Sequence, residues 1–450
     1  MTETFKRKNL FQLTLPLFLF GLMTIGVTFA DTMLLSNYSD NLAAAVSMAN
    51  QILGIGYDLS GLMSIGALIL ISQYLGRGDL ENAKNIARIG FIASVIFGML
   101  IAAILSGGAT FYADWINTPP EIYGDVLIYV YSISVGFIFY GFVTTALAAL
   151  RGFGKTLEIL LIGFVGNVVY LLFEYVLIYG VWIFPELGIY GAALSTILIR
   201  GINVLLLIWL LQWRLGLDVF KVPPGLWRQT KKILKLSYPS VSEALGYQLY
   251  QLFLVSLIAG IGVTAVLTRS YSLTITQLLA MIVLVISYGN EVLIGYDKGA
   301  GDHKIAFRRA LKTAVITGFT VMLFGLLIAV FGKFFLELFT RDQAIVSAAE
   351  EILYLHIFSI PFQAINLILF NSLKAVGDVN RPVIVNLSIT FAIALPLAWL
   401  FVSVMDMGVK GLWYGYIIEE IVKATSMFLL WRYRNWQRLK IIEDPAAAAV

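Results

Sequence analysis

The chain has 450 residues with a net charge of +4, and 59 % of its residues are apolar. Only 13 % are charged, about half the share of a soluble domain, so the composition excludes a soluble globule and also a disordered chain. There is no cysteine, and the two histidines, His303 and His356, lie far apart, which excludes disulfides and argues against a thiolate or paired-histidine metal site.

Apolar runs long enough to cross the hydrocarbon core of a membrane, about 20 residues each, recur along the chain. In chain order they predict helices over 10–36, 44–75, 88–112, 126–150, 158–181, 188–213, 231–260, 269–297, 306–332, 345–373, 382–404 and 411–433. Turn-forming residues such as Pro223-Pro224-Gly225 separate them. The first run follows basic residues, as in a signal peptide. It is too long and lacks a convincing cleavage site, so we expect an uncleaved helix.

Lysine and arginine are concentrated on one side of this predicted topology. With twelve spans, 25 of the 31 Lys and Arg fall on the side of the N-terminus and 4 on the opposite side, while Arg200 and Lys423 lie inside spans. Because cytoplasmic loops carry the excess of positive charge, both termini are predicted to be cytoplasmic. One helix more or fewer would destroy the alternation, so the bias also supports the even number of spans.

The two halves of the sequence superpose with a shift of 223 residues. The matching pairs are Leu15-Pro16 with Tyr238-Pro239, Gly76-Arg77-Gly78-Asp79 with Gly299-Ala300-Gly301-Asp302, Ala83 with Ala306, and Leu150-Arg151-Gly152-Phe153-Gly154 with Leu373-Lys374-Ala375-Val376-Gly377. Each half has six spans, so the repeats are parallel and related by an axis along the membrane normal. The predicted fold is an all-α polytopic membrane protein with twelve transmembrane helices in two pseudo-symmetric six-helix bundles.

The predicted domains follow from this repeat. Residues 1–213 form an N-terminal six-helix bundle, 214–230 a cytoplasmic linker, 231–440 a C-terminal six-helix bundle and 441–450 a tail. Two parallel bundles enclose a cleft, and rocking them against each other gives alternating access, which points to a secondary transporter. Nothing resembles a P-loop, so ATP hydrolysis by this chain is not expected.

Several short motifs occur in a specific order and spacing over residues 8–435. They are Phe29-Ala30-Asp31-Thr32-Met33, Ala49-Asn50-Gln51, Gln73-Tyr74-Leu75-Gly76-Arg77-Gly78-Asp79, Leu150-Arg151-Gly152-Phe153-Gly154, Gly191-Ala192-Ala193-Leu194-Ser195-Thr196, Gly299-Ala300-Gly301-Asp302 and Ala375-Val376-Gly377-Asp378. In these motifs the sequence resembles the multidrug and toxic compound extrusion (MATE) transporters. The major facilitator family, a rival with twelve helices, would need a D-R-x-G-R-type run between the second and third spans, which residues 74–88 lack.

The resemblance implies a cation-coupled antiporter that exports amphipathic, often cationic, small molecules. It implies no enzyme activity, no cofactor and no nucleic-acid partner. The expected setting is the lipid of the inner (plasma) membrane of a bacterium, where the protein acts as a monomer.

The coupling residues of this family map onto four positions of the chain. The Asp of the first span corresponds to Asp31, and the Thr of the sixth span to Thr196. In the fifth span, the acid corresponds to Glu174 and the Asn to Asn167. Glu174 stands where Asp is usual, and Tyr170 stands where the family often has Asn, four residues before that acid. These departures favour a proton over sodium as the coupling ion, while sodium at Asp31 stays open.

Without the family, the ionisable residues inside spans point to the same place, because each is expensive unless it is paired, hydrated or functional. Asp31, Glu174 and Thr196 lie roughly 8, 10 and 12 Å from the outer ends of their spans, so they can form one site. Two facing carboxylates repel each other, and such a pair can bind a proton or a cation in its place. An ion pair between Glu174 and Arg200 is the structural alternative. Pro16, about four turns inward of Asp31, predicts a hinge.

Other polar residues inside spans are candidates for a substrate cavity. They are Asp58, Tyr140, Tyr170, Arg200, Glu243 and Glu420, whose tyrosines offer aromatic faces to organic cations. Glu419, Glu420 and Lys423 have the i,i+3 and i,i+4 spacing of pairs along one helix, which predicts a neutralised structural group.

Three other functions compete with the cation-coupled exporter. A flippase for a lipid-linked precursor is the main alternative, but it would need a cleft rich in Arg and Lys to hold a pyrophosphate, and only Arg200 and Lys423 are deep. A polytopic membrane enzyme would need clustered His, Asp or Ser, and a channel would need a ring of charges. The sequence favours neither.

Overall fold

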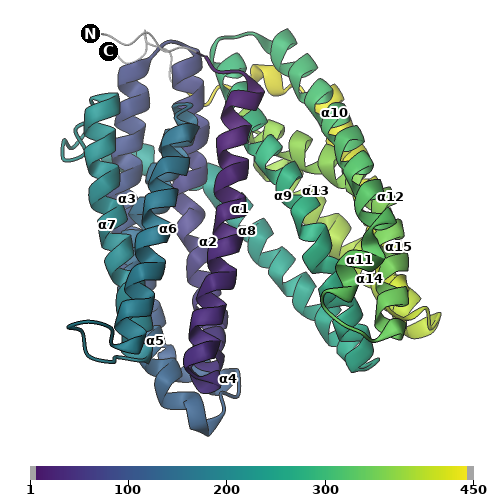
Figure 1. Ribbon diagram of the computed structural model, residues 1–450. Helices are drawn as coiled ribbons and strands as arrows, with labels where there is room; N and C mark the ends of the chain where they lie inside the picture. Colours follow the sequence, from purple (N-terminus) through teal and green to yellow (C-terminus); the bar gives the residue numbers. More distant parts are fainter. Residues whose placement is uncertain (1–6, 443–450) are drawn as a thin grey trace. The chain divides into compact units, whose positions relative to one another are not determined.

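The computed structural model describes residues 7–442, and almost all of them are helical (Figure 1). The chain divides into two compact units, Met1–Val241 and Ser242–Val450. The boundary falls inside the long helix α8 (Leu226–Ala259), later in the chain than the predicted linker 214–230. The predicted domain limits remain predictions, and residues 443–450 of the predicted tail lie outside the described part.

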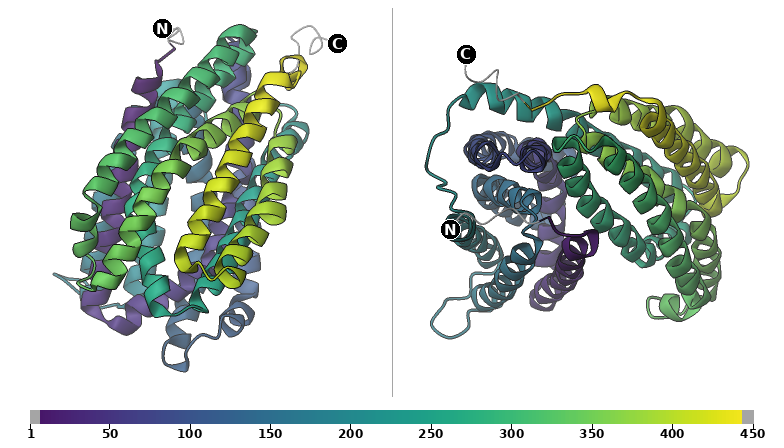
Figure 2. Two further views of the ribbon diagram at one scale, coloured as in Figure 1. Left: turned by 90° about the vertical axis from the view of Figure 1, so that its right-hand side faces the viewer. Right: turned by 90° about the horizontal axis from the view of Figure 1, so that it is seen from above.

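The first unit is built from long helices that run side by side (Figure 2). They are α1 (Leu10–Tyr38), α2 (Asp40–Gly76), α3 (Leu80–Gly107), the short α4 (Ala109–Trp115), α5 (Pro120–Gly152), α6 (Thr156–Tyr179), α7 (Ile189–Leu215) and the first turns of α8. α5 packs against α2, α3 and α7, and α6 packs against α1 and α7. The apolar residues of α2, α3 and α5 form the main core of this unit.

The second unit repeats this plan. It contains the rest of α8, then α9 (Val263–Gly299), α10 (His303–Val330), α11 (Gly332–Glu337), α12 (Gln343–Ala375), α13 (Asn380–Ile389), α14 (Leu395–Trp399) and α15 (Gly408–Tyr433). Two π-helical segments, Thr390–Ala394 and Leu400–Val404, join α13 and α14 into one continuous run that ends at Val404, and a 3₁₀ turn follows at Trp436–Arg438. α12 packs against α9, α10 and α15.

Every predicted span coincides with a long helix or with the run 380–404. Within the described residues, ten of these helical segments are long and apolar enough to cross a membrane. The remaining two long helices, α8 and α15, carry the buried polar residues described below, such as Glu420, and these lower their hydropathy. The twelve-helix, two-lobed fold predicted from the sequence is confirmed.

Two predicted ends are wrong. The predicted span 88–112 ends too late, because α3 stops at Gly107 and the chain turns at Gly108 before α4. The predicted span 306–332 likewise runs into α11, since α10 stops at Val330. Apolar residues continue through both turns, so hydropathy alone does not reveal them.

The backbone shows the internal repeat directly. Gly78 and Gly301, which the 223-residue shift superposes, have φ angles of 84° and 81°. Gly154 and Gly377, the next matching pair, have φ angles of 70° and 92°. Side chains rarely adopt this left-handed region, so both halves require glycine at the same two turns.

Helix packing inside the first unit depends on a close approach at Gly66 of α2. Its backbone N–H donates to Ser237 Oγ of α8 at 2.7 Å. A Cβ atom at Gly66 would lie 2.3 Å from the carbonyl oxygen of Ile233, whereas a Cβ at Gly61 of the same helix would meet nothing within 4 Å. Only Gly66 is therefore needed for this contact.

Pro16 lies inside α1, which continues through it without a break. A proline removes the hydrogen bond to the carbonyl four residues earlier, here that of Gln12. The Thr156 hydroxyl, at the start of α6, donates to this freed carbonyl at 3.3 Å. A side chain of α6 thus replaces the missing backbone bond of α1.

Candidate functional site

The C-terminal halves of α1 and α6 meet at two carboxyl groups and one tyrosine. Tyr170 Oη lies 2.5 Å from Asp31 Oδ1 and 3.1 Å from Glu174 Oε1. Tyr170 and Glu174 are four residues apart on α6, so they share one face, and α1 packs against that helix. Glu174 is 1 % exposed, and its second oxygen, Oε2, has no hydrogen-bond partner in the described residues.

A phenol has a single proton to donate, yet two carboxyl oxygens contact the Tyr170 hydroxyl. If both acids were ionised, the hydroxyl could donate to only one, and the other contact would bring two unprotonated oxygens together. The two acids also interact directly. The competition for the hydroxyl is resolved when one of the two carboxyl groups carries a proton, so the arrangement is suited to holding one.

Thr196, the third predicted coupling residue, lies next to this group rather than in it. Its hydroxyl donates to the Ala192 carbonyl at 3.1 Å and interacts with the hydroxyl of Tyr129 from α5. Tyr129 in turn has Asp31 and Arg200 among its electrostatic neighbours. Asp31, Glu174 and Thr196 therefore come together as expected, with Tyr129 and Tyr170 between them.

Arg200 of α7 does not pair with Glu174 in the described structure, so that structural alternative is wrong. Its Nη2 donates to Tyr57 Oη at 2.9 Å. Its guanidinium carbon lies 5.5, 5.7 and 5.0 Å from the ring centroids of Tyr57, Phe137 and Tyr140. This aromatic cage holds the cation by the ring faces, which leaves the two acids to each other.

The structure separates two predicted residues from the paired acids. Asn167 is on α6, two turns inward of Glu174, and its side chain has no hydrogen bond to either acid in the described residues. Asp58 of α2 is partly buried and has Tyr140 as an electrostatic neighbour, so it lies on the side of the aromatic cage. Their assignment to coupling and to a substrate cavity remains a prediction.

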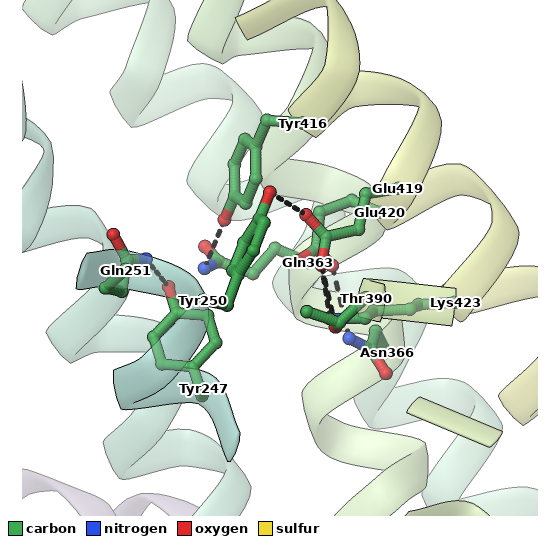
Figure 3. Close-up of polar contacts among 10 residues, drawn as sticks. All are labelled: Tyr247, Tyr250, Gln251, Gln363, Asn366, Thr390, Tyr416, Glu419, Glu420 and Lys423. Atoms are coloured by element: carbon green, nitrogen blue, oxygen red, sulfur yellow. Dashed lines mark hydrogen bonds and ion pairs between the residues drawn. The ribbon is translucent and has the colours of Figure 1, made fainter. Parts of the chain in front are cut away.

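A second polar cluster is buried in the second unit, around Glu419 of α15 (Figure 3). Glu419 Oε1 accepts hydrogen bonds from Lys423 Nζ at 2.6 Å and from Thr390 Oγ1 at 3.0 Å. Its other oxygen, Oε2, accepts one from Tyr250 Oη at 3.1 Å. The pair expected from the i,i+4 spacing of Glu419 and Lys423 is confirmed.

Glu420, the next residue, has a poorer environment. Its Oε2 accepts one hydrogen bond, from Asn366 Nδ2 at 3.2 Å, and it has no ion pair among the described residues. Beside it, Gln363 Nε2 donates to Tyr416 Oη at 2.7 Å. The carbonyl oxygens of Gln363 and Asn366 are buried and have no partner. Glu420 is therefore an incompletely satisfied acid.

Glu243, the remaining candidate, lies on α8 with its side chain bonded to Asn386 and with Lys374 and Lys423 as its positive electrostatic neighbours. At the other side of the cluster, Gln251 Nε2 donates to Tyr247 Oη at 2.6 Å. Arg269 Nη2 donates to Gln251 Oε1 at 2.7 Å. Glu243 and Glu420 thus belong to one polar region of the second unit.

Sequence reasoning missed several partners in both clusters. Tyr129, Thr390 and Asn366 were not singled out, because nothing in their spacing distinguishes them from other polar residues inside spans. In the described residues, no three His, Asp or Glu side chains are placed to hold a metal ion.

Comparisons with known proteins agree with this architecture. The MatE family pattern matches residues 16–176 and 239–400, two matches that begin 223 residues apart. The chain is similar to the "Uncharacterized transporter YisQ" of Bacillus subtilis, with 29 % identity over 96 % of this chain and 95 % of that protein. It is 24 % identical to the "Probable multidrug resistance protein NorM" of Thermotoga maritima, over 97 % and 94 % of the two chains.

A solved structure has the same fold. It is described as the outward-facing conformation of a multidrug resistance MATE family transporter. The TM-score is 0.84, with 21 % identity over 96 % of each chain.

Proposed function

Because the chain belongs to the MATE family of multidrug efflux transporters, and is a transporter rather than an enzyme, we propose that it exchanges protons for amphipathic, cationic small molecules. Alternating access between the two six-helix bundles moves the substrate out of the cell. The protein acts as a monomer in the bacterial inner membrane, with both termini in the cytoplasm, as the distribution of Lys and Arg indicates.

One observation carries the choice of the proton: the Tyr170 hydroxyl stands between Asp31 and Glu174. With one proton shared among them, the hydroxyl and the two carboxyl oxygens that contact it are all hydrogen-bonded without any added ion. Sodium would need both carboxylates ionised and the hydroxyl turned to present a lone pair. Uptake of a proton cancels a buried negative charge, and its release restores that charge, so the group can couple proton movement to a change of shape.

The flippase alternative is weaker for a geometric reason. Arg200 is held by Tyr57 and the aromatic cage, and Lys423 is held by Glu419. Lys423 is therefore not free to bind a pyrophosphate, and Arg200, whose Nη1 has no partner among the described residues, is one cation where a pyrophosphate cleft needs several.

The test is transport by the purified protein in proteoliposomes with separately imposed proton and sodium gradients. We expect ethidium export to follow the proton gradient and not the sodium gradient. Asp31→Asn keeps the shape of the side chain and removes its charge, so gradient-driven export should fall to the background of empty liposomes while the variant still folds. Normal export by Asp31→Asn, or export driven by sodium alone, contradicts the proposal.

A further inference from the structure

Glu419, Glu420 and Lys423 form a group of two acids and one base on a single helix of the second unit; we call it the glutamate–lysine site. The three side chains are 1 %, 5 % and 6 % exposed. The cost of burying a charge falls steeply when an opposite charge is in contact with it. The charge balance of this site therefore decides what else can enter it.

Lys423 neutralises only one of the two acids. Its ammonium group bonds to Glu419, whose two oxygens together accept three hydrogen bonds, from Lys423, Thr390 and Tyr250. Glu420 accepts a single amide hydrogen bond. The site thus has one acid that is complete and one that is short of a counter-charge.

Unpartnered acceptors surround Glu420. Asn366 is 8 % exposed, and while its Nδ2 contacts Glu420 its Oδ1 has no partner. Gln363 Oε1 is also buried without a donor. A carboxylate with two vacant carbonyl oxygens beside it is complementary to a ligand that carries positive charge and N–H donors.

The neighbouring charged groups do not change this balance. Glu243 has Lys374 and, more weakly, Lys423 as positive electrostatic neighbours, and counted together with Lys374 it adds no net charge. Arg269 reaches Gln251, and its electrostatic neighbours are Tyr247 and Tyr250 rather than the acids.

The last titratable neighbour is His356, which stacks on Tyr416. Its buried Nε2 has no partner that would stabilise a charge, so we count it as neutral. With Glu420 ionised, the glutamate–lysine site is left with a net charge of one negative unit.

Aromatic rings border the site on the side that reaches the surface of the unit. Tyr247 is 43 % exposed, and Tyr416, bonded to Gln363, is partly exposed (Figure 3). Ring faces bind organic cations. An amphipathic cation can thus place its charged end at Glu420 and its apolar body against these rings.

We infer that the glutamate–lysine site binds the charged end of the exported compound and that Lys423 sets its charge selectivity, admitting one positive charge and disfavouring two. This rests on the proposed function for the substrate class. A buried charge left unbalanced is costly, so a guest with a single charge completes the site and a dication leaves one charge in excess.

The experiment is equilibrium binding of ethidium, a monocation, and propidium, a dication with the same ring system, to the full-length protein in detergent with no gradient present. Lys423→Met raises the net charge of the site to two negative units. We expect it to shift the ratio of propidium to ethidium affinity toward propidium by about tenfold or more relative to the wild type. The double variant Glu419→Gln with Lys423→Met removes the ion pair but keeps one negative charge, so its ratio should remain that of the wild type.

Two further variants keep the test valid if Lys423→Met does not fold. Glu420→Gln and Glu419→Gln each make the site neutral, and both should weaken ethidium binding about tenfold. An unchanged ratio in folded Lys423→Met overturns the inference. So does ethidium binding of wild-type strength in Glu420→Gln, which removes the acid that contacts the charged end of the guest.

Asp31→Asn separates this inference from the proposed function. It should abolish proton-driven export in proteoliposomes, yet its propidium-to-ethidium ratio should match the wild type, because Asp31 belongs to the other unit. If export does not depend on the proton gradient but the affinity ratios of the variants change as expected, only the proposed function is contradicted. If export is proton-driven but the affinity ratio does not change in Lys423→Met, only the role of Lys423 is contradicted.

Discussion

At the scale of single residues, Tyr170 decides how the two acids of the first unit behave. Its hydroxyl is within hydrogen-bond distance of both, so the acids compete for one donor. The unpartnered Oε2 of Glu174 shows that no other described group relieves this competition. A proton on either acid does, so Asp31, Tyr170 and Glu174 form one hydrogen-bonded group.

Glu174→Gln should flatten the pH dependence of transport. Glutamine is neutral at every pH and still offers a carbonyl oxygen to Tyr170, so it imitates the protonated acid. The measurement is the initial rate of ethidium export in proteoliposomes between about pH 5 and 8. Glu158→Gln, in the first turn of the same helix, is the matched control and should keep the profile of the wild type. Identical profiles for Glu174→Gln and the wild type would remove Glu174 from the coupling group.

The sequence was sufficient to bring Asp31, Glu174 and Thr196 to one level of one bundle, because length and hydropathy determine depth. It did not predict the bridging role of Tyr170, which depends on the rotation of α6 about its axis against α1. Arg200 shows the same limit. Its depth allowed an ion pair with Glu174, but the cage of Tyr57, Phe137 and Tyr140 turns it elsewhere.

At the scale of helices, close packing is localised at particular glycines. The Gly66 contact fastens α2 to the first turns of α8, which is why the unit boundary falls within α8 and not before it.

In the run 380–404, the π-helical segment that contains Thr390 places this residue against Glu419. Neither feature has a signature in hydrophobic periodicity, so neither was predicted.

Gly66→Ala should lower the free energy of unfolding by about 1–3 kcal/mol, because the new methyl group overlaps the carbonyl oxygen of Ile233 and α2 must shift. Gly61→Ala, on the same helix with open space around it, should be close to neutral or slightly stabilising. Unfolding midpoints of the two variants in detergent provide the comparison. Equal midpoints would show that the packing at Gly66 is loose.

Helices α3 and α10 begin after the matching turns at Gly78 and Gly301, and an Asp precedes each helix. The two Asp residues differ in their hydrogen bonds. Asp79 caps α3 and accepts hydrogen bonds from the backbone and side chain of Asn82 and from Arg77. Partial burial raises the pKa of Asp79, but these hydrogen bonds outweigh it and the pKa is lowered. Asp302 caps α10 without any hydrogen bond from its side chain to the helix.

Because the pKa of Asp79 is lower in the folded state, its charge stabilises the fold above its unfolded pKa of about 3.9, and this contribution is lost as the pH falls through the folded value. The melting temperature of the wild type should exceed that of Asp79→Asn at pH 7, and the difference should shrink below about pH 4. The same series with Asp302→Asn should show a smaller difference at pH 7. A difference for Asp79→Asn that does not change with pH would refute the role of its charge.

At the scale of the whole molecule, the two halves share a plan but not a chemistry. The turns at Gly78 and Gly301 and the prolines Pro16 and Pro239 recur. The residue that the repeat places opposite Asp31 is Leu254, which cannot titrate. The sequence predicted the twelve helices and the repeat because both rest on long-range periodicity. It did not predict α4 and α11, which are short and follow apolar turns.

This asymmetry predicts that α1 and α6 respond to protons through Asp31, whereas the matching helices of the second unit, which have Leu254 in its place, do not. Spin-label distances between the outer half of α1 and α6 should change between high and low pH, and the change should disappear in Asp31→Asn. The matching distance in the second unit, between α8 and the run 380–404, should stay constant. A pH response of equal size in the second unit, or none in the first, would contradict the prediction.

The hydroxyl of Thr156 on the carbonyl of Gln12 has a mechanical consequence for α1. Among the described residues, α6 donates hydrogen bonds to α1 at three points: from Thr156 near the start of α1, from Tyr170 at Asp31, and from Tyr179 to the Leu34 carbonyl at 2.9 Å. Only the contact at Asp31 involves carboxyl groups. Releasing it leaves α1 held near both ends by Thr156 and Tyr179, so the helix must bow between these two points, and both of its ends stay in place.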